Sequence, residues 1–187
     1  MAAVVDTATA ARLALLIAGG YMAVYTHKSA TVQLDHFAPA EFGASWPAMA
    51  PKLLRALDQF REQLGEPLQV SPAPGAAART LGPGAGSLHN VTKHGSSYAI
   101  DVLIPEGYTL RGAYEAAKAS GLFSGIGVYP DWQPRPGLHL DVRHEVDTNP
   151  TPEATPDDPA RWGMVDNDEG EQVQVAVSDA LGGGWFA

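Results

Sequence analysis

The chain has 187 residues, of which 45% are hydrophobic and 18% charged, with a formal net charge of −9 and no cysteine. This length and composition are typical of one globular domain with short extensions. The acidic balance argues against a nucleic-acid partner, because phosphate binding needs a basic surface. The lack of cysteine excludes disulfides, cysteine nucleophiles and thiolate metal sites, so any metal site must use nitrogen and oxygen ligands.

The first 34 residues are predicted to form an apolar N-terminal extension. Residues 13–25 read LALLIAGGYMAVY, a run shorter than the roughly 20 residues that a membrane-spanning helix needs. No membrane span is therefore expected. A secretory signal fits poorly, since Asp6 and Arg12 are the charged side chains before the run and no clean small-residue cleavage site follows. A buried helix or a contact with another subunit are the alternative interpretations.

The domain proper is predicted to span residues 35–165. A helix is expected between Pro51, which suits a first turn, and Gly65, which suits a helix end. Its apolar face consists of five residues at helical spacing: Leu53, Leu54, Leu57, Phe60 and Leu64. A short strand is expected at residues 68–71. Residues 72–97 are rich in Gly, Ala, Pro and Ser and predict a long loop, and such loops are often functional.

Further short strands are expected around a second helix. The strands are predicted at residues 98–104, 126–129 and 138–143, and the helix between Thr109, a suitable cap, and Gly121. Residues 144–160 are acidic and proline-rich, which predicts an irregular connector, and residues 166–187 are predicted to form a C-terminal hairpin and tail. This order of elements predicts an α+β fold with a small, mainly antiparallel sheet flanked by helices.

Two of the predicted strands carry polar residues that could bind a metal. His139, Asp141 and Arg143 alternate with apolar neighbours and so share one face of their strand. Asp101 stands in an otherwise apolar strand, where a carboxylate is costly unless it is paired or binds a metal. His89 and His94 lie upstream in the long loop. Two histidines and one aspartate around an open position form the pattern of a catalytic zinc site.

These residues stand in motifs that resemble those of peptidase family M15, which comprises D-alanyl-D-alanine carboxypeptidases and hedgehog-type zinc peptidases. The Ser-x-His at residues 87–89, the glycine at 95 and the Ala-x-Asp at residues 99–101 resemble the first half of the family's zinc motif. Residues 125–130 (GIGVYP) and 137–143 (GLHLDVR) are similar to the second half. The similarity extends from residue 35 to 163 and points to a phage-encoded branch.

The resemblance implies a fold like that of hedgehog and the D-alanyl-D-alanine peptidases. It also implies a zinc ion held by His89, Asp101 and His139, and a peptidoglycan peptide as substrate. His94 is an alternative to His89, because its distance of seven residues from Asp101 is the usual family spacing. His89 has the serine two residues before it and the longer gap of the phage-like branch. Arg79 stands where family members hold a substrate carboxylate, a task that suits the guanidinium fork.

The sequence departs from the family at the general base. Many members have Glu or Asp three residues before the last histidine ligand, where this chain has Pro136. Asp141 is the nearest substitute, either as the base or as a carboxylate that orients His139, and Asp131 is a weaker candidate. Arg143 is a second candidate, beside Arg79, for orienting the peptide.

Three classes of function follow, of which the third is a non-catalytic module that binds the cell wall. The first is a phage-encoded zinc metallopeptidase, a carboxypeptidase or endopeptidase that cleaves peptidoglycan peptides and is located in the virion or in the periplasm or cell wall of the host. The second is a structural virion or tail component that keeps the peptidase fold and contacts other phage proteins through residues 1–34. Pro136 and the apolar extension favour the second class.

Overall fold

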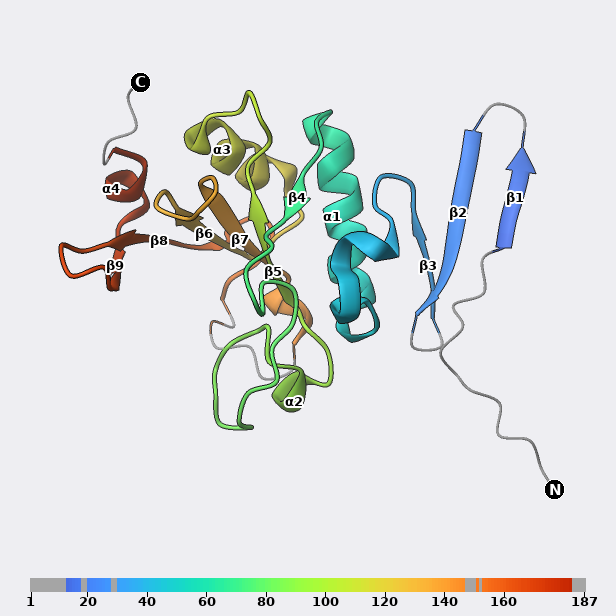
Figure 1. The fold of residues 1–187 in the computed structure, drawn as a ribbon, viewed down its shortest axis with the longest axis horizontal. Coiled ribbons are helices and arrows are strands. Elements are labelled where there is room, and N and C mark those ends of the chain that lie inside the picture. Colours follow the sequence, from blue (N-terminus) through green and yellow to red (C-terminus); the bar gives the residue numbers. More distant parts are fainter. Residues whose placement is uncertain (1–12, 18–19, 28–29, 147–150, 152, 183–187) are drawn as a thin grey trace.

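The computed structural model describes residues 13–17, 20–27, 30–146, 151 and 153–182. Two sheets are present (Figure 1). The N-terminal sheet consists of β1 (Leu13–Ile17), β2 (Gly20–His27) and β3 (Ala30–Leu34). The larger sheet consists of β4 (Gln69–Val70), β5 (Ala99–Leu103), β6 (Gly125–Tyr129), β7 (Gly137–Asp141), β8 (Ala160–Asp166) and β9 (Gln172–Val175). The α-helices are α1 (Pro51–Leu64), α2 (Val91–His94), α3 (Leu110–Ser120) and α4 (Val177–Gly182), and 3-10 helices span Pro39–Ala48 and Arg143–Glu145.

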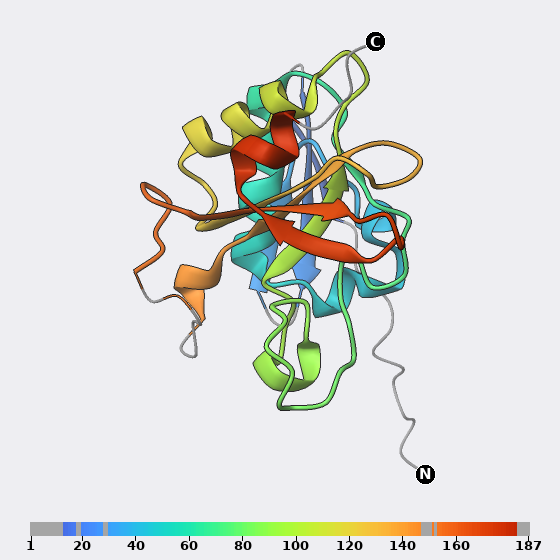
Figure 2. The same ribbon diagram turned by 90° about the vertical axis from the view of Figure 1, so that its left-hand side faces the viewer.

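The larger sheet has the strand order β4-β5-β7-β6-β8-β9. Its neighbouring strands are antiparallel except β6 and β8, which run parallel. Figure 2 shows the β8–β9 hairpin toward the viewer, with α3 and α4 above it and α2 below. The protein is therefore a mixed α/β structure with a six-stranded, mainly antiparallel sheet flanked by helices, which confirms the expected class in its coarse form.

The expectation of a buried helix in residues 13–25 is wrong, because the described part of this segment forms strands. β1 pairs with β2, and β2 with β3, both antiparallel. The sequence explains the difference: Gly19 and Gly20 interrupt the apolar run, and the residues after them are rich in aromatic and β-branched types that favour strands. In the described part of the chain no helix combines the length and the apolar character needed to cross a membrane.

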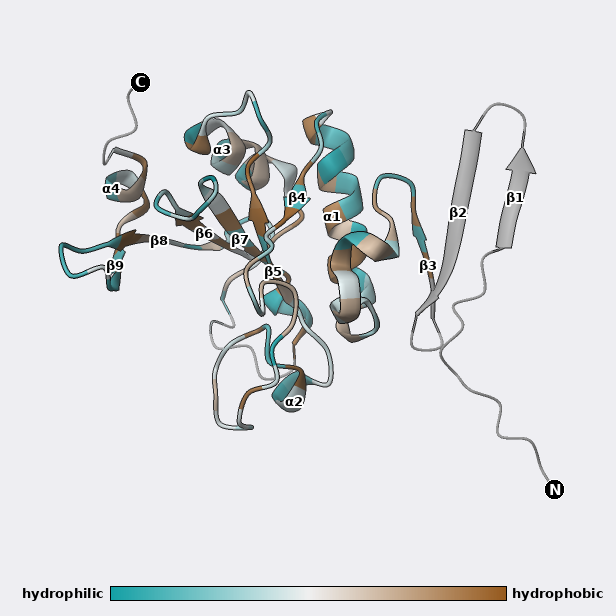
Figure 3. Ribbon diagram, in the orientation of Figure 1, coloured by the Kyte–Doolittle hydropathy of each residue, from teal (hydrophilic) through white to brown (hydrophobic). Residues whose placement is uncertain are grey.

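The helices begin and end where the local signals predict. α1 starts at Pro51 and stops before Gly65, whose φ of 67° is the left-handed conformation that glycine adopts easily. At the start of α3 the Thr109 hydroxyl accepts a hydrogen bond from the Gly112 amide at 3.0 Å. Figure 3 shows both hydrophilic and hydrophobic residues along the ribbon of α1, as expected of a helix with one buried face.

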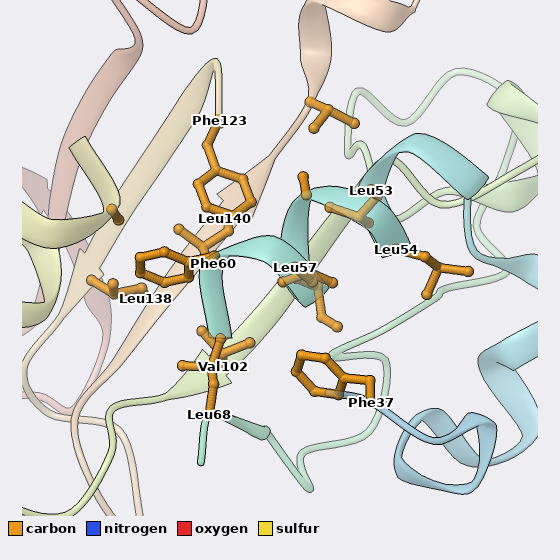
Figure 4. Packing of buried hydrophobic residues seen from close by; sticks show 14 of the residues in the cluster. Phe37, Leu53, Leu54, Leu57, Phe60, Leu68, Val102, Phe123, Leu138 and Leu140 are labelled. Atoms are coloured by element: carbon orange, nitrogen blue, oxygen red, sulfur yellow. The ribbon is translucent and has the colours of Figure 1, made fainter. Parts of the chain in front are cut away.

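The main core lies between the larger sheet and the helices α1 and α3 (Figure 4). Leu138 and Leu140 of β7 are fully buried there, and the rings of Phe60 and Phe123 meet edge to face at 5.4 Å. Because side chains alternate along a strand, burying Leu138 and Leu140 on this face places His139 and Asp141 on the other. The polar residues of β7 thus project from the face of the sheet opposite the core.

A buried aspartate links the N-terminal sheet to α1. Asp58 is 8% exposed, and its carboxylate accepts hydrogen bonds from the backbone amides of Asp35, His36 and Phe37 at 2.8, 2.8 and 2.9 Å. Val32 of β3 is fully buried in the same core. The chain that leaves β3 is therefore held against α1 by both apolar packing and charge-assisted hydrogen bonds.

Candidate metal centre

Four strands bring one residue each to a single row across the sheet. Asp101 of β5 is the register partner of His139 of β7, which is paired on its other side with Gly127 of β6. Gly127 in turn pairs with Trp162 of β8. Register partners lie side by side on one face, so the antiparallel pairing alone places the Asp101 carboxylate next to the His139 imidazole.

The third member of the site comes from the long loop. His89 is 2% exposed, and its carbonyl accepts a hydrogen bond from the Arg79 amide at 2.8 Å. The next residue, Asn90, is fully buried; its side chain accepts from the Thr92 amide at the start of α2 and donates to the Gly82 carbonyl at 2.9 Å. These contacts fix the loop, and with it the position of the His89 ring over the sheet.

Three ligand-type atoms converge as a result. Nδ1 of His139 lies 3.0 Å from Oδ1 of Asp101 and 3.2 Å from Nε2 of His89, and the latter is 3.3 Å from the same Asp101 oxygen. Ligands about 2.0–2.1 Å from a tetrahedral zinc ion are separated from one another by about 3.3 Å, so this triangle has the size of one face of such a site. The buried group of His89, Asp101 and His139 could hold a metal ion.

His94, the alternative ligand, does not join this group in the structure. It is the last residue of α2, and its ring meets that of Tyr98 edge to face at a centroid distance of 6.4 Å. Burial lowers the pKa of His94, with a smaller contribution from the charge of Lys93. The described geometry therefore places His89 in the group and leaves His94 outside it.

Asp141 lies beside His139 on the side away from Asp101. Its Oδ2 is 3.2 Å from Nε2 of His139, and its exposure is 0%. Arg143 donates to both oxygens of this carboxylate, from Nε to Oδ1 at 2.9 Å and from Nη2 to Oδ2 at 2.6 Å. Metal-binding histidines commonly donate the N–H of their second ring nitrogen to a carboxylate. Asp141 has the position of such a carboxylate, which would orient the His139 ring.

The charges of the group shift the proton affinities strongly. Burial lowers the pKa of His139, but the hydrogen bonds to Asp101 and then Asp141 outweigh it and raise the pKa to about 9. For Asp141, burial raises the pKa and the contacts with Arg143 and His139 lower it to about 2. Burial acts against ionisation of Asp101 as well, yet its two histidine partners hold its pKa well below the usual range. The pKa of His89 is lowered, chiefly by burial.

A cavity of about 430 Å³ opens beside the group and is lined by His89, Asp101 and His139. Arg79 also lines it, with its Nη2 3.2 Å from Oδ2 of Asp101 and its side chain 41% exposed. Arg79 is thus paired with Asp101 and is also accessible from the cavity. Among the described residues, Asp101 is the one carboxylate that lines this space.

Three other residues considered from the sequence lie outside the cavity lining. Arg143 is buried, with one guanidinium nitrogen 2.6 Å from the Thr151 hydroxyl and the others on Asp141. Asp141 is enclosed as described above. Asp131 accepts a hydrogen bond from the Asp166 amide at 2.9 Å, which joins the turn after β6 to the β8–β9 hairpin.

Several cavity residues were not singled out by the sequence as functional: Ser71, Tyr129, Trp132, Gln133 and Gln172. Tyr129 and Trp132 stack, with ring centroids 4.0 Å apart and an interplanar angle of 22°. Tyr129 lies within the GIGVYP motif and Trp132 just after it, and this position in the sequence could have indicated that they line the site. Gln172 arrives from β9, and nothing in the sequence near it indicates a site.

The two glycines of β6 leave room for the larger side chains of the row. A Cβ at Gly127 would lie 2.7 Å from the Trp162 ring, and one at Gly125 would collide with the Asp141 carboxylate. At either position a Cβ would lie closer to its neighbour than non-bonded atoms can approach. The two glycines of β6 therefore allow the side chains of Trp162 and Asp141 to lie against the backbone of this strand.

Comparisons with protein-family models, with curated proteins and with solved structures found no match to this chain. Fold and site together define a mixed α/β protein with a buried His–Asp–His group, open to a cavity, that could hold a metal ion.

Proposed function

We propose that the protein is a zinc-dependent peptidase that hydrolyses peptidoglycan peptides. The observation that carries the proposal is the triangle of His89 Nε2, Asp101 Oδ1 and His139 Nδ1, with sides of 3.0–3.3 Å, at the wall of a cavity of about 430 Å³. Two imidazoles and one carboxylate suit zinc, and three protein ligands leave the fourth position that a catalytic site needs. The substrate class is proposed from the resemblance of the motifs to those of family M15.

Zinc bound by these residues supplies a Lewis acid that polarises a peptide carbonyl and makes a water acidic enough to attack near neutral pH. Asp141 acts as a positioning residue in this proposal: it holds Nε2 of His139, so Nδ1 faces Asp101 and His89. Arg143 neutralises Asp141 and keeps it in place. With an exposure of 0% and no place in the cavity lining, Asp141 cannot reach the attacking water to accept its proton.

The proton acceptor we assign is Oδ2 of Asp101. The two histidines contact Oδ1 of this carboxylate, whereas Oδ2 lies 3.2 Å from Nη2 of Arg79, which lines the cavity. The low pKa of Asp101 makes it a weak base, so we expect hydrolysis to be slow compared with relatives that carry a separate carboxylate at the position of Pro136.

Arg79 is assigned to the carboxylate at the end of the substrate peptide. Its guanidinium is accessible from the cavity, and its Nε is held by the Gly75 carbonyl at 3.0 Å. A fixed guanidinium can bind a carboxylate through two parallel hydrogen bonds, which favours a carboxypeptidase over an endopeptidase.

The test is the release of D-alanine from a peptidoglycan stem peptide by the full-length protein, measured by mass spectrometry after its zinc content is determined. We expect about one zinc per chain, and release that stops with a chelator and returns with zinc. Asp101→Asn is the matched variant, since it keeps the side-chain size and removes the ligand charge. A zinc-loaded protein that leaves stem peptides and isolated wall material intact would rule out the enzyme.

A second candidate function is that of a structural virion component that retains the peptidase fold. Its support is specific: Pro136 stands at the usual base position, and Asp101 is the one carboxylate lining the cavity among the described residues. The three-stranded sheet beside α1 would be its contact surface (Figure 1). Wild-type protein that binds zinc without cleaving wall peptides, and that co-purifies with phage particles, would favour this candidate.

A further inference from the structure

Tyr129 lines the cavity that is also lined by the His–Asp–His group. It is the last residue of β6, and its register partner on β7 is Gly137, two residues before His139. Diagonal neighbours of this kind on one face of a sheet lie about 7–8 Å apart, within reach of a long aromatic side chain. Tyr129 and His139 therefore face the same space from adjacent strands.

The hydrogen bonding of this hydroxyl leaves its proton available. Nε1 of Trp162 lies 3.3 Å from the Tyr129 oxygen. An indole N–H can only donate, so the tyrosine oxygen is the acceptor in this bond. Among the described residues the structure offers no acceptor for the Tyr129 O–H itself.

The neighbours also fix where the hydroxyl points. Trp132 stacks on the Tyr129 ring at 4.0 Å, while Trp162 lies across Gly127, the register partner of His139. The Trp162 ring is 5.3 Å from the His139 ring. The hydrogen bond from Trp162 therefore holds the Tyr129 oxygen beside the ring that also contacts His139.

We propose that the Tyr129 hydroxyl donates a hydrogen bond to the substrate oxygen that becomes negative when the scissile carbonyl turns tetrahedral. This inference rests on the proposed function. Water adds to the carbonyl carbon while the C=O electron pair moves onto oxygen; the pair returns as the C–N bond breaks, and the amine leaves with the proton taken from the water. Tyr129 keeps its own proton throughout.

A donor of this type needs to stay protonated, and the surroundings ensure that. Burial raises the pKa of the Tyr129 hydroxyl above its ordinary value of 10.0, and it outweighs the hydrogen bond from Trp162, which acts in the opposite direction. A donor fixed before the reaction stabilises developing charge without reorganising, and this is the reason such groups contribute strongly to catalysis.

The first measurement compares Tyr129→Phe with the wild type in steady-state hydrolysis of a stem peptide. Phenylalanine keeps the ring that stacks on Trp132 and removes only the hydroxyl. We expect kcat to fall about a hundredfold, the typical effect of losing one such donor, with KM and zinc content unchanged. Tyr108→Phe is the matched control, since that hydroxyl donates to the Leu64 carbonyl at 2.8 Å and does not line the cavity; it should leave kcat unchanged.

A second measurement does not depend on turnover. A phosphinate pseudo-dipeptide, whose tetrahedral phosphorus carries two oxygens, is titrated calorimetrically into each zinc-loaded protein. Tyr129→Phe should weaken its binding at least tenfold while binding the product peptide as the wild type does. Equal phosphinate affinity and equal kcat in Tyr129→Phe and the wild type would overturn this inference and leave the peptidase assignment standing. A wild type that neither cleaves the peptide nor binds the phosphinate would overturn both.

Discussion

The carboxylate of Asp141 occupies the space that a side chain at Gly125 would fill. The two residues are register partners on β7 and β6, and a Cβ added to Gly125 would collide with the Asp141 oxygens. A glycine on one strand thus decides whether a carboxylate on the next can reach Nε2 of His139.

We predict that Gly125→Ala weakens zinc binding without touching a ligand. The methyl group displaces Asp141, and the His139 ring loses the partner that fixes its orientation; losing such a partner costs roughly 10–100-fold in metal affinity. Competition with a chromogenic chelator measures the effect. Gly84→Ala is the control, because a Cβ there meets no atom within 4 Å. Equal zinc affinity in both variants would contradict the positioning role of Asp141.

Substitution of His89 and substitution of His94 should have different effects on the zinc content of the protein. His89→Ala removes a member of the group, so the purified protein should contain well under one zinc per chain. His94→Ala should retain about one, since its ring lies against Tyr98 and outside the group. Elemental mass spectrometry after metal-replete preparation gives the ratio. A loss of zinc in His94→Ala with retention in His89→Ala would reverse the ligand assignment.

Zinc affinity should rise with pH. A ligating histidine must be neutral, and the pKa of His139 is raised to about 9 in the metal-free protein, so zinc displaces one proton at pH 7. The dissociation constant should fall about tenfold per pH unit from pH 7 and level off near pH 9, measured in metal-buffered titrations. A flat profile over this range would show that His139 carries no proton to displace.

The free energy of unfolding of the metal-free protein should fall as pH rises, whereas zinc affinity should increase. A folded-state pKa above the ordinary 6.5 means that the His139 contribution is complete below pH 6.5 and is lost as pH rises through about 9. Urea unfolding of chelator-treated protein should therefore show a lower midpoint at pH 9 than at pH 7. The comparison with zinc-loaded protein, in which His139 is neutral at both values, isolates this contribution.

Arg79→Met should impair substrate binding more than metal binding. The substitution keeps an unbranched side chain of similar reach and removes the guanidinium. We expect KM for a peptide with a free C-terminal carboxylate to rise at least tenfold, with a smaller change for the C-terminal amide, and zinc content near one. If both peptides respond equally, Arg79 does not bind the carboxylate.

Asp58→Asn should destabilise the fold and leave the site intact. An amide replaces one of the oxygens that accept the amides of Asp35, His36 and Phe37, and a buried donor without its acceptor costs about 1–3 kcal/mol. Denaturant unfolding checks this against Asp157→Asn, an exposed acid that should change stability by less than about 0.5 kcal/mol.

Local signals in the sequence were sufficient to predict the ends of α1 and α3, and to predict that β7 has one polar and one apolar face. Pro51, Thr109 and the glycines at 65 and 121 act on the backbone within one or two turns, so their effect does not depend on distant contacts. The alternation around His139 predicted a polar face for the same reason. For residues 13–25 the helix was one of the alternatives and is wrong, because apolar character alone does not separate a helix from a strand pair.

The choice between His89 and His94 was made by the tertiary structure. Both are loop histidines within twelve residues of Asp101, and which ring reaches the sheet depends on bonds from the loop to distant segments, such as the Arg79 amide on the His89 carbonyl. The same holds for Asp141, whose position beside His139 depends on the absence of a side chain at Gly125 on another strand. The sequence determined which residue types could form a metal site; their distances and accessibility depend on long-range packing, which no local pattern encodes.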